Sequence, residues 1–292
     1  MLLLKSKTLI EKSKPPNYCI INYQRNQRNY HSIRAVMANA LPSNLLDESL
    51  GGSSGGGRMI LVEDCVETSG AFVVHHLLKR ALNSHSSDAV VFLSFSHPLS
   101  HYDRVLRKMG CNLSVQRDNK RLLFLDMLAL DHLDRNRGKT SEDILIALYG
   151  EIQKAVEISR SHEARHHITV VIDDVSLMEV DANGSSDLVL DFLRYCCSLT
   201  AQFGCSLIAL NHGDVYSTVD QPNLLLQLEY LADIVIKIEP LATGLAKDVH
   251  GQLTVTNRNL RVDSGKSRSR IHNFQFRIKD NSVEYFYPGS KT

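Results

Sequence analysis

The chain of 292 residues is 43% apolar and 22% charged, which is the composition of a soluble globular protein with one or two domains. With a net charge of +1, the chain as a whole has no strong electrostatic field to attract nucleic acid or membrane, so any basic binding surface must be local. No apolar run approaches the ~20 residues that span a bilayer, so no membrane partner is expected.

The cysteines indicate a reducing compartment. They show no C-x-x-C spacing and follow no clear secretory signal, which favours free thiols in a cytoplasmic or nuclear protein. The six are Cys19, Cys65, Cys111, Cys196, Cys197 and Cys205.

Residues 1–57 differ in composition from the rest of the chain. Up to Arg34 they contain four lysines and three arginines against one acid, as an organelle presequence does, but Pro15-Pro16 interrupts any amphipathic helix there. An upstream extension with the natural start at Met37 is the alternative. Residues 45–50 could form one or two helical turns, and the glycine- and serine-rich residues 51–57 are typical of a flexible tether. We therefore predict a flexible basic extension with a linker at 1–57 and a folded domain at 58–292.

The first stretch of the predicted domain, residues 59–80, has the pattern of a strand, a turn and an amphipathic helix, as in a P-loop. Set against G-x-x-x-x-G-K-[S/T], the first glycine is Cys65, the second is Gly70, the lysine is Ala71 and the hydroxyl residue is Phe72. Ala71 cannot pair with phosphates and Phe72 cannot hold Mg²⁺, so the predicted nucleotide site is degenerate and the protein is not expected to be an enzyme. Phe72 is expected to point into the core. An ordinary strand–turn–helix remains the alternative.

Strands and helices then alternate, which predicts an α/β domain with a mainly parallel sheet flanked by helices. A serine at position 141 is a plausible N-cap for the helix that begins at Asp143. The predicted strands cover 89–95, 121–126, 168–172, 205–212 and 232–239, and the predicted helices cover 100–109, 143–159, 187–203 and 224–231.

Polar side chains follow two of these strands. Asp173 and Asp174 end one strand at the place where an Asp holds Mg²⁺ in P-loop proteins. Acids also end buried strands simply to meet solvent or to cap the next helix, and the losses at Ala71 and Phe72 favour this second interpretation. Asn211 and His212 end another strand where a γ-phosphate sensor would lie, although hydrogen-bonding turn residues are the simpler interpretation. We therefore expect no metal and no cofactor.

The last part of the chain alternates with a period of two, which predicts antiparallel strands at 251–256, 274–279 and 283–287. Between the first two lies a predicted loop with five cations and one acid, Asp263. The loop could contact the phosphates of a nucleic acid or could simply be solvated. No aromatic residues interleave the charges, so base stacking has no support. The five candidate phosphate-contacting residues are Arg258, Arg261, Lys266, Arg268 and Arg270, and they become the candidate tRNA-contacting residues under the resemblance described below.

This order of elements resembles a RecA-like ATPase core that has lost its nucleotide machinery. More narrowly, residues 59–289 resemble the family of the sixth Elongator subunit, in a form similar to its plant members, whereas the basic extension and tether are not part of the family's core. The Asp-Val-His-Gly-Gln-Leu stretch at 248–253 is the most specific match. The other matching stretches are 61–72, Phe95, 100–102, Asp173-Asp174, 190–192, 195–196, 240–244, 274–278 and 285–286.

The resemblance implies a non-catalytic subunit that forms a hetero-hexameric ring with Elongator subunits 4 and 5 and joins subunits 1–3 in the whole complex. It implies that the ring binds tRNA, that nucleotide hydrolysis within it promotes tRNA release, and that the complex modifies wobble uridines. A cytoplasmic and nuclear location is expected. The alternative is a recombinase-type RecA paralogue acting as an ATP-dependent DNA-binding enzyme, which would need the P-loop that this chain lacks.

Overall fold

The computed structural model of the protein describes residues 44–51, 57–83, 88–129, 139–161, 167–216, 223–244, 246–261 and 267–290. Every described helix and strand belongs to one compact unit, Leu45–Thr292. The predicted presequence and the start at Met37 lie outside the described residues, as does most of the predicted tether.

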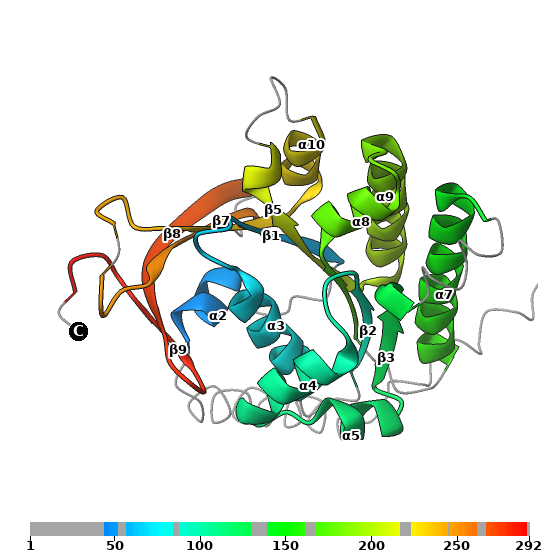
Figure 1. The fold of residues 1–292 in the computed structure, drawn as a ribbon, viewed down its shortest axis with the longest axis horizontal. Helices are drawn as coiled ribbons and strands as arrows, with labels where there is room; N and C mark the ends of the chain where they lie inside the picture. The colour runs from blue at the N-terminus through cyan, green and yellow to red at the C-terminus, as the bar shows by residue number, and fades with distance from the viewer. Residues whose placement is uncertain are drawn as a thin grey trace, which may run out of the picture. The chain divides into compact units, whose positions relative to one another are not determined.

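One mixed sheet forms the centre of this unit, with the strand order β3-β2-β4-β5-β1-β6-β7-β8-β9 (Figure 1). Neighbours from β3 to β6 are parallel, and neighbours from β6 to β9 are antiparallel, as the sequence predicted. The strands are β1 (Arg58–Asp64), β2 (Ala89–Ser94), β3 (Leu122–Asp126), β4 (Ile168–Asp173), β5 (Ser206–His212), β6 (Ile234–Glu239), β7 (Gly251–Arg261), β8 (Ser267–Ile278) and β9 (Val283–Phe286).

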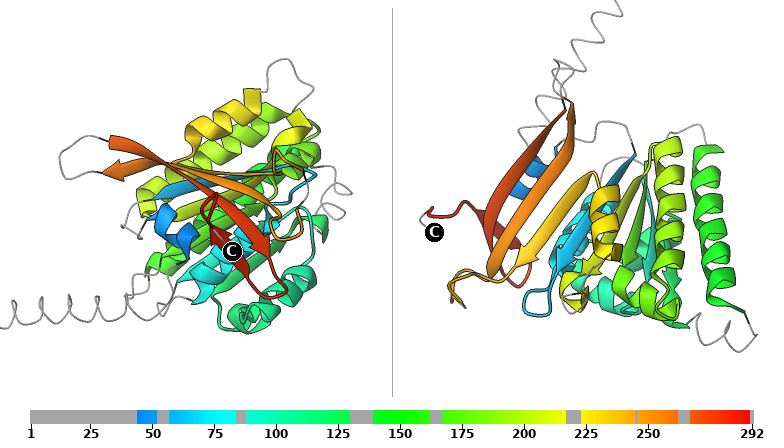
Figure 2. Two further views of the ribbon diagram at one scale, coloured as in Figure 1. Left: turned by 90° about the vertical axis from the view of Figure 1, so that its left-hand side faces the viewer. Right: turned by 90° about the horizontal axis from the view of Figure 1, so that it is seen from above.

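Helices cover both faces of the parallel part, which explains why β4 is buried along its whole length. Two hydrophobic cores result. One lies between α2 to α5 and one face of the sheet, and the other lies between α7 to α10 and the opposite face (Figures 1 and 2). The helices are α2 (Leu45–Leu50), α3 (Ala71–Asn83), α4 (Leu99–Lys108), α5 (Leu113–Asp118), α7 (Ser141–Ser161), α8 (Val175–Asp181), α9 (Ser186–Phe203) and α10 (Asn223–Leu231), with the 3₁₀ turn η2 at Gly213–Tyr216. None of the described helices is long and apolar enough to cross a membrane.

The folded unit begins earlier than the sequence suggested. We expected the domain to start near Arg58, but Leu46 and Leu50 of α2 are fully buried in the core beneath α3. The side-chain amide of Asn257 on β7 donates to the carbonyl oxygens of Ser49 and Leu50, each at 3.4 Å. Helix α2 therefore packs into the domain ahead of the tether, because its leucines cover apolar surface that β7 and α3 leave open.

The cap of α7 also differs from the prediction. Ser141 is the first helical residue, and Thr140 precedes it as the cap. The Thr140 hydroxyl oxygen accepts from the amide of Asp143 at 3.1 Å, and the Asp143 carboxylate accepts from the amide of Thr140 at 3.1 Å. This reciprocal pair is a capping box in which the acid is Asp143.

The predicted basic loop is largely a β-hairpin. Strand β7 continues to Arg261 and β8 begins at Ser267, so the connection shrinks to residues 262–266, which lie outside the described residues. A register shift between Asn257 and Leu260 keeps the two strands paired. The strand was not recognised in the sequence because arginine and serine alternate along this stretch without apolar residues of period two.

Candidate functional site

The carboxyl ends of three neighbouring parallel strands form the candidate site. The order β4-β5-β1 places the ends of these strands side by side, and Asp64 of β1 is the register partner of His212 of β5. In open α/β sheets, ligands bind outside the carboxyl ends of the strands, and we call this line of strand ends the edge. The polar residues at the three strand ends therefore decide which ligand can bind there.

The loop after β1 occupies the place of a P-loop but satisfies its own amides. The Gly70 amide donates to Asp64 Oδ2 at 2.6 Å, and the Val66 amide donates to Asp214 Oδ2 at 3.0 Å. The amides of Thr68 and Ala71 donate to the Cys65 carbonyl oxygen at 3.0 Å and to Ser69 Oγ at 3.3 Å. A working P-loop aims its amides at phosphates. Here the carboxylate of Asp64, at the end of the preceding strand, accepts from the Gly70 amide in place of a phosphate.

Gly70 serves packing in this loop. A Cβ on Gly70 would lie 3.1 Å from atoms of Asp64, Val62 and Ile238, which is tighter than ordinary contact. The retained glycine thus lets the loop pass close over the ends of β1 and β6. Close approach of the loop backbone to the sheet explains this glycine without any ligand.

The remaining loop residues carry no phosphate chemistry. Ala71 begins α3, and the half-buried Phe72 ring packs with its centroid 4.7 Å from that of Phe276 on β8. Phe72 therefore contributes to the core beneath α3, as predicted. Desolvation raises the pKa of the half-buried Cys65 thiol, which keeps it protonated at neutral pH.

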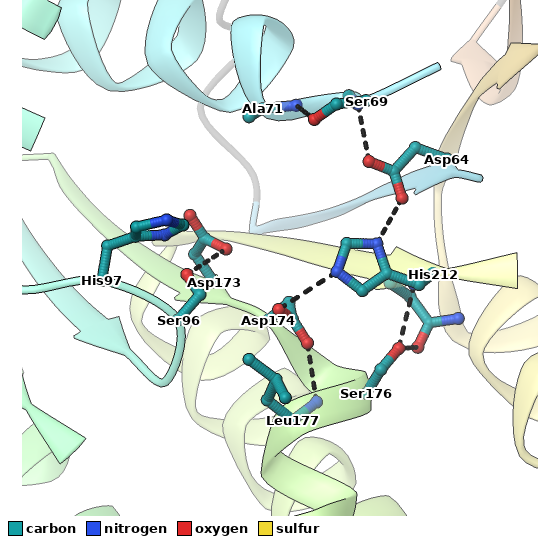
Figure 3. Close-up of polar contacts among 12 residues, drawn as sticks. Asp64, Ser69, Ala71, Ser96, His97, Asp173, Asp174, Ser176, Leu177 and His212 are labelled. Atoms are coloured by element: carbon teal, nitrogen blue, oxygen red, sulfur yellow. Dashed lines mark hydrogen bonds and ion pairs between the residues drawn. The ribbon is translucent and has the colours of Figure 1, made fainter. Parts of the chain in front are cut away.

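His212 connects two strand ends through ion pairs (Figure 3). Its Nδ1 lies 2.5 Å from Asp64 Oδ1, and its Nε2 lies 3.2 Å from Asp174 Oδ2. The hydrogen bonds to Asp174 and to Asp64 raise the pKa of His212 to about 10, against desolvation, so the ring is an imidazolium at neutral pH. Both carboxylates have only 1% of their side-chain surface exposed. We call Asp64, His212 and Asp174 the edge triad.

The two acids after β4 have separate partners (Figure 3). Asp174 caps α8, since its Oδ1 accepts from the Leu177 amide at 2.7 Å. Asp173 accepts from Tyr102 on α4 at 2.8 Å and from the Ser96 hydroxyl at 3.1 Å. Burial raises the pKa of Asp173. Within the described residues, no group of three or more His, Cys, Asp or Glu side chains is arranged to hold a metal ion.

Sequence reasoning identified parts of this edge and missed their connection. Asn211 and His212 were expected as hydrogen-bonding turn residues, and Asn211 Oδ1 indeed accepts from Ser176 Oγ at 3.2 Å. The role of Asp64 was missed entirely. An acid and a histidine at the ends of two strands were the available signal, but only the β1–β5 register shows that they meet.

Of the five predicted tRNA-contacting residues, four lie on the strands β7 and β8 and not in a loop. Arg258 is half-buried, its guanidinium donates to the Glu229 carbonyl oxygen, and its amide donates to the Asp233 carbonyl oxygen at 2.9 Å. Arg270 is exposed on β8, Arg261 and Arg268 lie on the hairpin strands, and Lys266 lies outside the described residues. Arg258 is therefore a structural residue that ties β7 to α10.

Comparisons with solved structures agree with this fold. A KaiC-like protein from Pyrococcus horikoshii OT3 superposes with a TM-score of 0.57 at 14% identity, covering 83% of this chain and 95% of the other. An uncharacterised protein from the same archaeon gives 0.56 at 17% identity, covering 80% and 92%. At such low identity the likeness shows the fold alone. The predicted RecA-like fold is confirmed.

Sequence comparisons give a narrower relationship. Elongator complex protein 6 of Xenopus laevis is 30% identical over 248 residues, which cover 80% of this chain and 91% of the relative. The human protein of the same name is 28% identical over 247 residues with the same coverage. The family model described as Elongation complex protein 6 matches residues 43–280, and its start agrees with the position of α2. This chain belongs to the Elongation complex protein 6 family.

Proposed function

We propose that this protein is a non-catalytic subunit of the Elongator complex, which forms a hetero-hexameric ring with Elongator subunits 4 and 5 and takes part in the binding of tRNA for wobble-uridine modification. Subunits 1–3 complete the assembly, which works in the cytoplasm and the nucleus. Family membership supports the assignment to Elongator, and the RecA-like scaffold supports assembly with other chains of the same fold.

The edge triad carries the non-catalytic part of this proposal. A nucleotide site needs free amides for phosphates and free carboxylate oxygens for Mg²⁺. Here the Gly70 amide is taken by Asp64, and Asp174 is shared between His212 and the Leu177 amide. An imidazolium stands between two carboxylates where a triphosphate and its metal would need to bind. The protein has thus filled its own site with side chains whose net charge is negative, which would also repel a triphosphate.

Two measurements on the full chain test this proposal. Isothermal titration with Mg·ATP should give no binding heat, and the melting temperature should not change with saturating nucleotide, since a ligand that binds the native state must raise it. Tagged full-length protein should co-purify two further RecA-like chains in equal amounts. ATP turnover by the pure chain would contradict the non-catalytic role.

A restoration series sharpens the nucleotide test. The double variant Ala71→Lys, Phe72→Thr returns the phosphate-binding groups but leaves Asp64 on the Gly70 amide. We expect it to remain unable to bind nucleotide, whereas adding Asp64→Gly should open the loop. Binding of ATP by the double variant alone would show that the triad does not block the site. DNA-dependent ATP hydrolysis by the unmodified protein would instead favour a recombinase-type enzyme.

A further inference from the structure

A cluster of cations covers α4, α5 and the turn that follows them. Arg104, Arg107, Lys108, Arg117 and Lys120 are all exposed, and two acids, Asp103 and Asp118, accompany them. We call these five cations the cationic face. On the opposite side of the sheet, helices α7 to α10 together contain nine acids and three cations. The net charge of +1 therefore hides a strong asymmetry between the two helical layers.

Helix α4 directs three of these cations to one side. Arg107 and Lys108 follow Arg104 by three and four residues, so each is a neighbour of Arg104 on the helix surface, while Tyr102 and Leu106 are buried in the core. Together with Ser100 and Asp103, the three cations line a shallow depression of about 460 Å³.

The acid in this depression is already neutralised. Asp103 Oδ2 lies 2.5 Å from Arg107, and its Oδ1 accepts from the amides of Leu113 at 2.9 Å and Ser114 at 3.4 Å. Asp103 thereby anchors the start of α5 and leaves little free negative charge. Within the described part of the chain, Arg104 and Lys108 form no hydrogen bond or ion pair, so both remain available to an external anion.

The chemistry of the face favours a phosphodiester backbone over a protein partner. Protein interfaces are centred on exposed aromatic or apolar residues. Val115 is the one large hydrophobic residue of α4 and α5 with more than about a third of its surface exposed, and Tyr102 is buried. Contacts to nucleic-acid backbones instead come mainly from arginine and lysine side chains, and without exposed aromatic rings they carry no base specificity.

We propose that the cationic face binds the phosphate backbone of RNA without reading its sequence. The choice of RNA as the polyanion rests on the proposed function, whereas the position of the surface rests on the charges described above. In this assignment α4 and α5 form the RNA-contacting surface, and the β7–β8 hairpin does not.

The test compares two neutralised variants of the full chain. Arg104→Gln, Lys108→Gln removes two charges and leaves the Asp103–Arg107 pair that anchors α5. Lys154→Gln, Arg194→Gln is the matched control, since it removes two exposed cations from α7 and α9 on the other side of the sheet. Binding of fluorescently labelled tRNA is followed by anisotropy from 50 to about 200 mM salt, with equal melting temperatures showing that both variants fold.

We expect the α4 variant to bind tRNA about tenfold more weakly at low salt, and the slope of log affinity against log salt to flatten by about two. The control should match the wild type. Equal affinity and slope in all three proteins would overturn the assignment of the surface and leave the subunit role intact. Loss of partner co-purification by the α4 variant, with unchanged tRNA affinity, would also overturn it, because the face would then be a protein interface. Absence of tRNA binding by the wild-type chain would overturn it too, whereas failure of co-purification alone would contradict only the proposed assembly.

Discussion

The charges of the edge triad are paired within the fold, whereas the charges of the cationic face are exposed to solvent. In the triad, His212 pairs with two carboxylates of 1% exposure at distances of 2.5 and 3.2 Å. On α4, Arg104 and Lys108 are exposed and stay outside any ion pair of the described residues. Charges that are paired inside the fold contribute to its stability, whereas charges left exposed can attract a ligand. At the place where a P-loop protein binds its nucleotide, the charges of this chain thus serve the fold. The cations that remain free to bind an anion lie on α4.

Removing the cation of the triad should have the largest effect on stability. His212→Ala leaves Asp64 and Asp174 buried without their shared counter-charge, and breaking a buried ion pair costs about 3 kcal/mol. We expect the free energy of unfolding, measured by urea denaturation, to fall by about that amount. Arg194→Ala, which removes an exposed pair with Asp191, should change it by less than about 0.5 kcal/mol. Equal losses of unfolding free energy in the two variants would show that the triad stabilises the fold no more than a surface ion pair does.

The stability from His212 should depend on pH. A histidine in the unfolded chain titrates near 6.5, and the folded pKa is about 10. The stabilisation is therefore fully present below about pH 6.5 and is lost as the pH rises toward 10. The difference in urea midpoint between wild type and His212→Ala should shrink from pH 6 to pH 9.5. A constant difference would mean that the ring does not bind its proton more tightly in the folded state.

Glu63, on the face of β1 opposite Asp64, sharpens the comparison because it is buried with incomplete pairing. Its Oε2 lies 3.1 Å from Lys237, but Oε1 has no hydrogen-bond partner among the residues that the structure describes, and burial raises the pKa of Glu63 to about 7. Ionisation costs stability above the unfolded pKa of 4.5, and this cost is complete above about 7.

Glu63→Gln should consequently stabilise the protein by about 1 kcal/mol at pH 8 and leave it nearly unchanged at pH 4.5. Lys237 keeps its partner Glu229 in this variant, with 2.6 Å between the charged atoms. Urea denaturation at the two pH values measures the effect. Destabilisation at pH 8 would show that the pair with Lys237 outweighs the burial of the charge.

The smallest effect is expected at the hairpin. Arg270 is the one predicted tRNA-contacting residue whose side chain is both described and exposed, and Arg270→Gln should change tRNA affinity by less than about twofold. The same anisotropy titration measures it. An effect as large as that of the α4 double variant would return the RNA-contacting surface to the hairpin.

Some of these features could be predicted from the sequence because they depend on neighbouring residues. The strand–turn–helix at 59–80, the loss of phosphate chemistry at Ala71 and Phe72, and the antiparallel C-terminal strands all follow from local patterns. The hairpin strands at Arg261 and Ser267 escaped prediction because the sequence there carries no apolar alternation. The helical turns at 45–50 were expected, but their packing into the domain escaped prediction because a six-residue helix beside a glycine-rich stretch does not show which surface it covers.

The sequence by itself determined the order of the strands and of the longer helices, since burial on both faces requires continuous apolar strands and helices need apolar stripes, whereas the short α5 and α8 were not predicted. It also determined that no lysine or hydroxyl group follows Gly70. Only the tertiary structure decided what fills the resulting gap. Asp64 and His212 are 148 positions apart in the chain, and they meet because β1 and β5 pair in parallel register.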